Sequence, residues 1–299
     1  MTSGRDARFE ALLDHLRRTR EIDLSGYKRS SLMRRVSKRL RMAGVEDTLE
    51  YVDYLEAHPE EYPLLLDTIL VNVTSFFRDQ PTWEYLGREI VPRILEPKGR
   101  GDALRVWSAG CASGEEVYTL AMILAEALGV DAFIDRVRIY ASDVDEDALA
   151  QARAASYREV VLDSVPEAMR RKYFIRRDRR FVFREDLRPS IIFGRHDLVQ
   201  DAPIPRLDLL TCRNTLMYLD TATQGSILTR FHRALTDAGY LLLGEAEILL
   251  THRLLFIPAD LAYRVFSKTP GTGVKERPPA LTAESEPTVE RAEGGRRTS

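Results

Sequence analysis

The spacing of apolar residues changes character near residue 84. Before that point apolar positions recur at helical intervals, and glycine or proline separates the segments. The expected helices are residues 9–20, 30–42, 48–57 and 61–70. Helices this short need one another to bury a core. Residues 1–70 are therefore predicted to form a helical domain, which a linker, residues 71–83, joins to the rest of the chain.

From residue 84 to 268 short apolar runs alternate with helical patterns. The expected strands lie near residues 104–109, 137–141, 190–194, 207–212, 239–244 and 261–267. Such alternation predicts an α/β fold, with a doubly wound, mostly parallel sheet covered by helices on both faces. The C-terminal residues 269–299 are rich in Pro, Gly, Thr and Glu, and we expect them to be disordered.

The segment of about residues 157–190 interrupts this alternation. Residues 179–184 read Arg-Arg-Phe-Val-Phe-Arg and follow a turn-like stretch. The pattern predicts a small antiparallel β-subdomain inserted in the main sheet. A decorated crossover connection is the alternative.

Residues 106–122 run from an apolar strand through a turn of small residues into a helix that begins with two carboxylates. Gly110 and Gly114 let another molecule approach the backbone, whereas Glu115 and Glu116 would repel a phosphate. Neither the P-loop nor the dinucleotide fingerprint is present. The loop therefore favours a cationic or neutral guest such as S-adenosylmethionine. An ordinary strand-to-helix turn without a ligand is the alternative.

A second acidic signal follows the expected strand 137–141. In a doubly wound sheet the ligand lies across the carboxyl ends of the strands, so Asp143 is placed to accept the ribose hydroxyls of an adenosine. Capping of the next helix is the alternative. Residues 143–154 also imitate the start of a calcium loop, but Ala148 and Ala154 stand where glycine and glutamate are needed. We expect no metal.

Composition favours an intracellular enzyme. The chain has 299 residues, of which 44% are apolar, and no apolar run approaches the roughly 20 residues of a membrane span. Two cysteines and five scattered histidines give neither a disulfide framework nor a zinc spacing, and no signal-peptide pattern opens the sequence. We expect a cytoplasmic monomer that does not insert into a membrane.

The net charge of −2 conceals a division within the first 70 residues. Residues 1–45 carry twelve Lys or Arg against five acids, and residues 46–70 carry eight acids and no Lys or Arg. In the helix 30–42 an apolar face leaves a basic stripe toward solvent, suited to an acidic partner. The stripe consists of Arg34, Lys38 and Arg41, with Arg35 and Arg39 beside it. A solvated face without a partner is the alternative.

Three segments together resemble the CheR-type chemotaxis receptor methyltransferases. They are Asn-Val-Thr-Ser-Phe-Phe-Arg at 72–78, the loop at 107–122, and Thr-Cys-Arg-Asn-Thr-Leu-Met-Tyr at 211–218. The resemblance covers roughly residues 8–268 and implies a class I S-adenosylmethionine methyltransferase fold. It also implies a reaction: transfer of a methyl group from S-adenosylmethionine to glutamate side chains on the cytoplasmic helices of a chemoreceptor. The products would be γ-methyl esters and S-adenosylhomocysteine, in chemotaxis adaptation or a related signalling pathway.

The same resemblance implies the site residues. Arg78 and Tyr218 would be catalytic, the linker would contribute to the active site, and the basic stripe would contact the receptor. The implied cofactor-binding residues are Asn72, Thr74, Arg78, Ala109, Gly110, Glu116, Asp143, Asp197, Leu198, Asn214 and Thr215. The glycine-free turn at 176–180 is shorter than the loop of members that grip a receptor's C-terminal pentapeptide, so we expect no dependence on that tether.

Other interpretations of these residues stay open. Phe76 and Phe77 fit a core plug at the domain junction. Arg78 could form a structural ion pair, and Asn214 and Tyr218 could cap their loop. A substrate carboxylate is already ionised at neutral pH, so methyl transfer to it depends on positioning rather than on a general base.

Two alternative functions compete with receptor methylation. A nucleic-acid methyltransferase would use the basic helix on phosphates. However, the Asn/Asp-Pro-Pro-aromatic run of base-amino methyltransferases is missing after Asn214, and Thr211 stands where cytosine C5 enzymes have proline before their cysteine. We expect no nucleic-acid partner. The other alternative is a catalytically silent module that senses the cofactor.

Overall fold

Four helices pack their apolar faces into one small core. The computed structural model describes residues 2–247 and 254–269, and its first lobe is formed by α1 (Thr2–Arg20), α2 (Arg29–Ala43), α3 (Thr48–Ala57) and α4 (Glu61–Leu70). Leu12, Leu16, Tyr51 and Leu65 are fully buried there. The helix α1 begins seven residues before the predicted start because the apolar pattern reports only the part that packs, from Phe9 onward.

A buried ion pair lies inside this helical lobe. The guanidinium of Arg39 donates to both carboxylate oxygens of Glu61, at 2.5 and 2.6 Å, and the Tyr51 hydroxyl donates to the same carboxylate at 2.6 Å. The side chains of Arg39 and Glu61 are 13% and 5% exposed. Arg39 therefore points into the lobe, and the exposed basic stripe consists of Arg34, Lys38 and Arg41.

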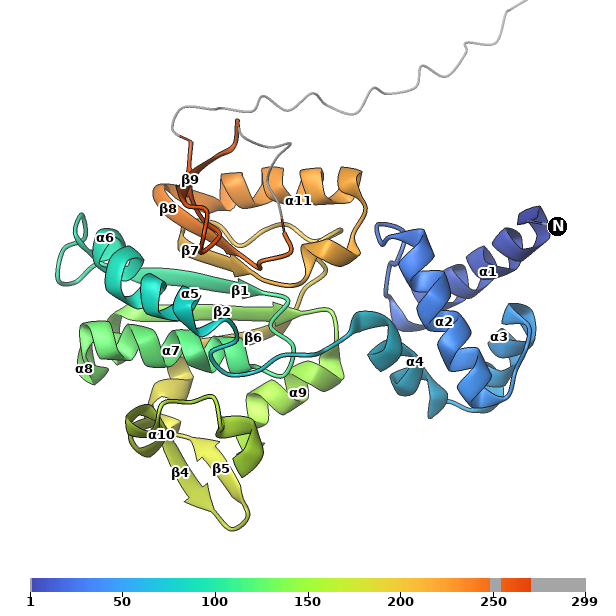
Figure 1. Cartoon of the computed structure of the whole chain (residues 1–299), viewed down its shortest axis with the longest axis horizontal. Helices are drawn as coiled ribbons and strands as arrows, with labels where there is room; N and C mark the ends of the chain where they lie inside the picture. Colours follow the sequence, from blue (N-terminus) through green and yellow to red (C-terminus); the bar gives the residue numbers. More distant parts are fainter. Residues whose placement is uncertain (1, 248–253, 270–299) are drawn as a thin grey trace, which may run out of the picture.

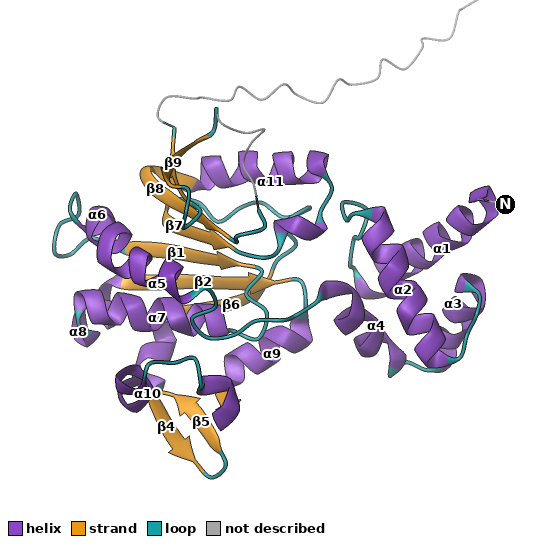
Figure 2. Cartoon of the chain, in the orientation of Figure 1, coloured by secondary structure: helices purple, strands orange, loops and turns teal. Residues whose placement is uncertain are grey.

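The second lobe is built on a seven-stranded sheet of order β6-β2-β1-β7-β8-β10-β9, as Figures 1 and 2 show. The first five of these strands are parallel to one another, and β10 runs antiparallel to β8 and β9. The strands are β1 (Leu104–Ala109), β2 (Val137–Asp143), β6 (Ile191–Arg195), β7 (Leu207–Cys212), β8 (Leu235–Leu243), β9 (Phe256–Asp260) and β10 (Val265–Lys268). The predicted mostly parallel α/β sheet is confirmed.

Helices cover both faces of this sheet. Along β1, Val106 joins the core beneath α7, whereas the next residue, Trp107, joins the core beneath α11. Such alternation places two separate apolar cores on opposite faces. The helices of this lobe are α5 (Gln80–Tyr85), a π-helical turn (Leu86–Ile90), α6 (Val91–Leu95), α7 (Glu115–Leu128), α8 (Val130–Arg136), α9 (Glu146–Ala154), α10 (Glu167–Tyr173) and α11 (Thr221–Ala234).

The predicted last strand, residues 261–267, was wrong in its bounds. The structure has a hairpin there, with a turn at 261–264 between β9 and β10. Strand β9 carries Pro258, and at the edge of the sheet its proline needs no ladder partner. A proline within a short run masks a strand in the sequence, so the pattern predicted only the second arm. Residues 270–299, which we expected to be disordered, lie outside the described residues.

The inserted antiparallel β-subdomain is also confirmed. Its sheet has the order β3-β5-β4, formed by β3 (Ser156–Arg158), β4 (Phe174–Arg177) and β5 (Arg180–Phe183). The β4–β5 turn is two residues long and has Asp178 in the left-handed region, with φ of 53°. A short helical turn at Glu159–Leu162 follows β3 within the subdomain, and another at Glu185–Ser190 follows β5.

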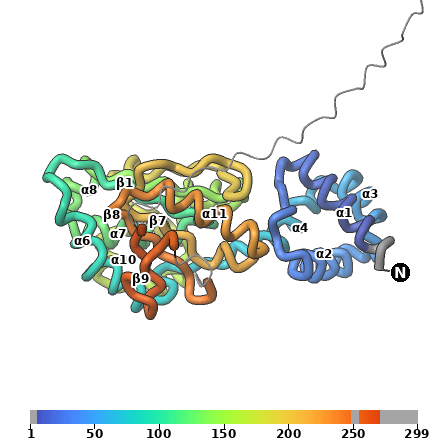
Figure 3. Tube along the Cα trace, turned by 90° about the horizontal axis from the view of Figure 1, so that it is seen from above, coloured from blue at the N-terminus to red at the C-terminus, as the bar shows by residue number. Residues whose placement is uncertain are grey.

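Seen from above, the two lobes lie side by side, with the helical lobe next to the carboxyl ends of the parallel strands (Figures 1 and 3). Residues 71–79 cross from α4 to α5 along this junction. Among the described helices, none alone is long and apolar enough to span a membrane. The pair α7 and α8 passes that test of length and composition together but is bent by 116°.

We predict that Glu61→Gln lowers the free energy of unfolding by about 3 kcal/mol, because it leaves Arg39 buried without its opposite charge. The hydrogen bonds from Arg39 hold the pKa of Glu61 below its usual range. This stabilisation is therefore present at neutral pH and is lost as the pH falls through the folded-state pKa. Urea unfolding curves at neutral pH and near pH 4 measure it.

The control is Glu60→Gln, since Glu60 is exposed one residue away. If both variants unfold at the same urea concentration at neutral pH, the buried pair adds no net stability to the lobe.

Candidate cofactor and active site

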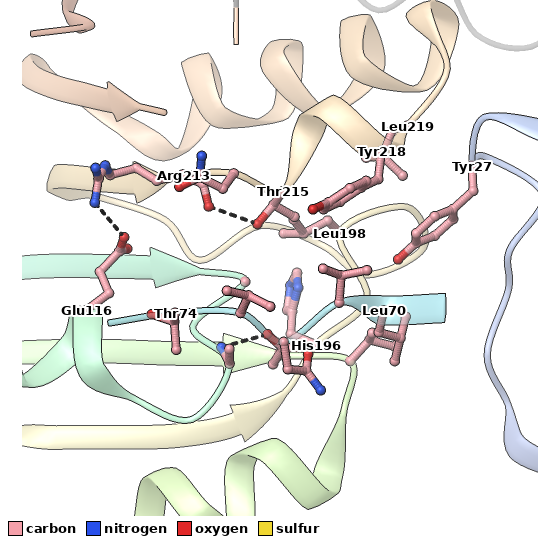
Figure 4. Close-up of a pocket in the computed structure, with 18 of the residues that line it drawn as sticks. Tyr27, Leu70, Thr74, Glu116, His196, Leu198, Arg213, Thr215, Tyr218 and Leu219 are labelled. Atoms are coloured by element: carbon pink, nitrogen blue, oxygen red, sulfur yellow. Dashed lines mark hydrogen bonds and ion pairs between the residues drawn. The ribbon is translucent and has the colours of Figure 1, made fainter. Parts of the chain in front are cut away.

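A pocket lies between the two lobes, at the carboxyl ends of β1, β2, β6 and β7 (Figure 4). Of the residues predicted for cofactor binding or catalysis, those that line it are Asn72, Thr74, Arg78, Gly110, Glu116, Asp143, Asp197, Leu198, Asn214, Thr215 and Tyr218. Ala109 does not line it, because it is fully buried within β1. The structure thus brings together residues that lie up to 146 positions apart, from Asn72 to Tyr218.

The loop after β1 forms one wall through its backbone. Gly110 has φ of 79°, and a Cβ atom on it would lie 2.4 Å from the Thr215 hydroxyl oxygen. The amides of Gly110 and Cys111 donate to the carbonyl of Ser142 at 2.8 and 2.9 Å, which fastens the loop to the end of β2. Glycine is therefore required at position 110 both for its backbone conformation and for the close approach of Thr215.

Glu116 is held at the base of the pocket by neutral and charged partners. Its Oε1 accepts hydrogen bonds from the hydroxyls of Ser108, at 2.9 Å, and Thr211, at 2.6 Å. Its Oε2 lies 3.5 Å from a guanidinium nitrogen of Arg213. The carboxylate is thereby fixed between β1, β7 and the loop after β7.

Arg213 is a site residue for which the sequence indicated no role, although it lies in the segment 211–218 that resembles the CheR-type enzymes. Its side chain is 2% exposed and pairs with Asp79 at 2.6 Å as well as with Glu116. Its guanidinium also stacks over the Trp83 ring, 4.8 Å from the centroid. One arginine thus neutralises part of the charge of two acids, and the pocket keeps an excess of carboxylate.

Asp143 closes the second wall at the end of β2. Its two oxygens accept the backbone amides of Ala112, at 2.8 Å, and Asp145, at 3.0 Å. Burial nevertheless raises its pKa, with those amide bonds acting in the opposite direction. The cap of α9 is Asp145, which accepts from the amides of residues 147 and 148, so Asp143 is free of that role.

The linker is tied to this wall. The Asn72 amide donates to the Asp145 carboxylate at 2.5 Å, so its side chain is already engaged with the protein. The Arg78 guanidinium donates to the carbonyl of Val73 at 2.9 Å. Phe76 and Phe77 are buried, the first in edge contacts with Tyr157 and Phe174, and they form the expected core plug.

The third wall depends on Glu247, which the sequence did not reveal. Its buried carboxylate accepts the amides of Asn214, Thr215 and Leu216 at 3.1, 2.8 and 2.7 Å, and that of Gly244 at 2.7 Å. Asn214 has φ of 59°, a left-handed conformation that asparagine tolerates. Glu247 follows β8 and lies 29 residues beyond Tyr218, so only the fold shows that it caps this loop.

The helical lobe reaches the same wall through α2. The guanidinium of Arg35 lies 4.4 Å above the ring centroid of Tyr218 and donates to the carbonyl of Ile69 at 2.5 Å. Arg35 is half-buried in this position. Arg35 therefore contacts the predicted catalytic tyrosine and does not belong to the exposed stripe.

Two family models match this chain in consecutive segments. The CheR methyltransferase all-alpha domain matches residues 7–70, and the CheR methyltransferase S-adenosylmethionine-binding domain matches residues 72–264. The chain belongs to the CheR methyltransferase family. As a member of that family it is a methyltransferase that uses S-adenosylmethionine.

Similar proteins agree with this membership. A 104.1 kDa protein of Rhodobacter capsulatus is 32% identical over 278 residues, which are 89% of this chain and 29% of that protein. The chemotaxis protein methyltransferase of Borreliella burgdorferi is 32% identical over 234 residues, 76% of this chain and 82% of that protein. The chemotaxis protein methyltransferase of Escherichia coli is 31% identical over 251 residues, 81% and 84% of the two chains.

The pocket of this CheR-family methyltransferase fits its cofactor. Carboxylates outnumber cations among the lining side chains, which suits a ligand with an ammonium and a sulfonium group. Within residues 2–247 and 254–269, the buried nitrogens Nδ1 of His196 and Nε of Arg213 have no hydrogen-bond partner. In that same part of the chain, no group of three or more His, Cys, Asp or Glu side chains is placed to hold a metal ion.

We predict that Asp143 accepts the ribose hydroxyls and that Asp143→Ala weakens cofactor binding. Loss of a charged acceptor costs about 1.5 to 3 kcal/mol, which is roughly a 10- to 150-fold rise in Kd. Calorimetric titration with S-adenosylhomocysteine measures it. Asp143→Asn, which keeps the size of the side chain, separates the loss of charge from the loss of packing.

Asp178→Ala, in the exposed hairpin turn of the β-subdomain, is the matched control and should bind as tightly as the parent chain. A parental Kd for Asp143→Ala would show that the ribose is held elsewhere.

Proposed function

We propose that this methyltransferase esterifies glutamate side chains on the cytoplasmic helices of a chemoreceptor, in chemotaxis adaptation or a related signalling pathway. The names of its relatives from Borreliella burgdorferi and Escherichia coli support a role in chemotaxis. The observation that carries the choice of a carboxylate is the placement of Arg78 and Tyr218 on the lining of the cofactor pocket. Both side chains can hold a carboxylate, and neither is a nucleophile there.

The roles of the lining residues follow from their chemistry. When bound, S-adenosylmethionine supplies a methyl group on a positively charged sulfur, which is released as neutral S-adenosylhomocysteine once the methyl has moved to the substrate oxygen. Arg78 orients the substrate carboxylate with its planar guanidinium fork. The Tyr218 hydroxyl contacts the same carboxylate from another wall. No residue has to remove a proton, because a glutamate is ionised at neutral pH.

We propose that the remaining lining groups hold the cofactor. Glu116 faces the ammonium group in this proposal, and Asn72, Thr74, Asn214 and Thr215 also line the pocket. Asp197 and Leu198 face the adenine side.

Receptor recognition is assigned to the exposed side of α2. Arg34, Lys38 and Arg41 are exposed there, whereas Arg35 contacts Tyr218 and Arg39 pairs with Glu61. The receptor sites are themselves acidic in this proposal, so a positive surface accelerates the encounter. Substitutions of Arg35 or Arg39 do not test this effect, because replacing either of them also disturbs contacts within the protein.

A nucleic-acid substrate receives less support. Cys212, the residue closest to the nucleophile position of cytosine C5 enzymes, is fully buried, and burial raises the pKa of its thiol well above the usual range. A neutral, buried thiol is a poor nucleophile. The basic side of α2 alone does not select nucleic acid over an acidic protein.

We predict that the labelled product is a carboxyl ester. After incubation with methyl-labelled S-adenosylmethionine and a receptor cytoplasmic fragment, mild alkali should release the label as volatile methanol, because esters hydrolyse there and methylated nitrogens do not. Label that stays bound at high pH, or that goes preferentially to RNA or DNA in the same mixture, contradicts the proposal. A preparation that binds cofactor and labels nothing supports the silent module.

The exposed stripe gives a second prediction. Arg34→Glu combined with Lys38→Glu should raise the KM for the receptor fragment several-fold at low salt and less at high salt, because ions screen charges over about 8 Å at physiological ionic strength. Cofactor affinity should stay unchanged. Steady-state methylation rates at two salt concentrations measure the effect.

The matched control is Arg88→Glu combined with Arg171→Glu, a charge reversal of the same size at side chains that are 70% and 74% exposed on the other lobe. An equal KM for the double variant and the control at low salt would indicate that the exposed side of α2 is a solvated face without a receptor partner. The same assay, run with fragments that contain or lack their last five residues, tests independence from the tether; equal rates are expected.

A further inference from the structure

We propose that Tyr27, from the helical lobe, is a cofactor-binding residue whose ring covers the adenine of S-adenosylmethionine. The proposal rests on the cofactor and not on the identity of the methyl acceptor. It makes the helical lobe part of the cofactor site as well as the expected receptor-binding surface.

The backbone around Tyr27 is fixed to the catalytic lobe. Tyr27 and Leu219 form an isolated antiparallel bridge, with Lys28 N donating to Tyr218 O at 2.8 Å and Asp220 N donating to Gly26 O at 2.9 Å. Gly26 lies against Thr223 so closely that a Cβ atom there would be 2.8 Å from the threonine methyl. The position of Tyr27 is therefore set by hydrogen bonds and close packing across the lobe junction.

The side chain of Tyr27 extends from this bridge into the pocket. Figure 4 shows its ring beside Leu70 and across from Tyr218 and Leu219, with the hydroxyl toward the interior. The ring is half-buried and packs against the cores of both lobes. Burial raises the pKa of Tyr27, and the carboxylates of Asp143 and Asp197 add to the rise. The phenol stays neutral at physiological pH.

The two ends of the pocket differ in polarity, which decides the part of the cofactor that meets Tyr27. Glu116, Arg213 and Thr74 lie at the end far from Tyr27 (Figure 4). The aliphatic side chains larger than alanine in the lining are Leu70, Val71, Val73, Val144, Leu198, Val199 and Leu219. Three of them, Leu70, Leu198 and Leu219, stand near Tyr27 in Figure 4. A charged methionine moiety is favoured at the first end. The carboxylates of Asp143 and Asp197 also lie toward Tyr27 and can accept hydrogen bonds from an adenosine, so the second end favours the nucleoside, with its flat base against the apolar side chains.

Calorimetry with two ligands tests the proposal in the full chain. S-adenosylhomocysteine contains the whole scaffold, whereas 5′-methylthioadenosine lacks the amino-acid part. Tyr27→Ala should weaken both ligands by about 10-fold, because an aromatic ring stacked on a base is lost. Tyr27→Phe keeps the ring and should stay within about threefold of the parent chain for both. Glu116→Gln should weaken S-adenosylhomocysteine and leave 5′-methylthioadenosine unchanged.

The variant Lys28→Met separates a direct contact with the cofactor from an effect on how the helical lobe packs against the catalytic lobe. The Lys28 ammonium donates to the carbonyl of Met217 at 2.8 Å across the junction and does not line the pocket. Parental affinity in Lys28→Met is expected. The proposal is overturned if Lys28→Met weakens 5′-methylthioadenosine as much as Tyr27→Ala does, if Tyr27→Ala binds both ligands as the parent does, or if it weakens only S-adenosylhomocysteine. Thermal unfolding without ligand confirms that each variant is folded.

Discussion

Arg213 joins the parts of the site that the chain brings from different places. Its guanidinium reaches Glu116 at the start of α7, Asp79 at the end of the linker, and the face of Trp83 in α5. A guanidinium that is 2% exposed carries a large desolvation cost, which two carboxylates and an aromatic face offset. This pairing joins the loop after β7 to the start of α7, which follows the loop after β1, and to the linker. Without it the carboxylates of Glu116 and Asp79 would lose this opposite charge.

A second constraint joins the helical lobe to the same loop. The bridge between Tyr27 and Leu219 and the stacking of Arg35 on Tyr218 both act on residues 217–220. Arg35 lies on the same helix as the exposed Arg34 and Lys38, one position and three positions away. A contact made on the outside of α2 is therefore one helical turn from a side chain that touches Tyr218. The proposed receptor-binding surface and the predicted catalytic tyrosine are thus joined through α2 and Arg35.

The sequence predicted the helices and strands whose apolar residues follow a regular spacing. It also predicted the inserted subdomain, which interrupts the alternation of strands and helices. The strand ends at Ala109 and Cys212 follow from apolar runs that stop at polar or small residues. The second strand was predicted to end at residue 141, and the structure extends it to Asp143. These ends position most of the pocket. Glu247 and Tyr27 carry no such signal, because their contacts depend on which strands and loops become neighbours. Arg39 illustrates the same limit. Helical periodicity places it beside the exposed stripe, and only the packing of α4 against α2 supplies the acid that draws it inward.

The electrostatics of the pocket give the proposed reaction its main physical difficulty. Glu116, Asp143 and Asp197 line a space that an anionic glutamate has to enter, and burial raises the pKa of Asp143 and Asp197, so their charges already stand in an unfavourable environment. The positive charges of Arg78 and Arg213 offset part of that negative charge. Asp79 in turn neutralises part of the charge of Arg213. The remaining positive charge has to come from the cofactor. A glutamate therefore meets less repulsion in a pocket that holds S-adenosylmethionine than in one that holds its neutral-sulfur product, and this difference favours release of the product before the next substrate side chain enters.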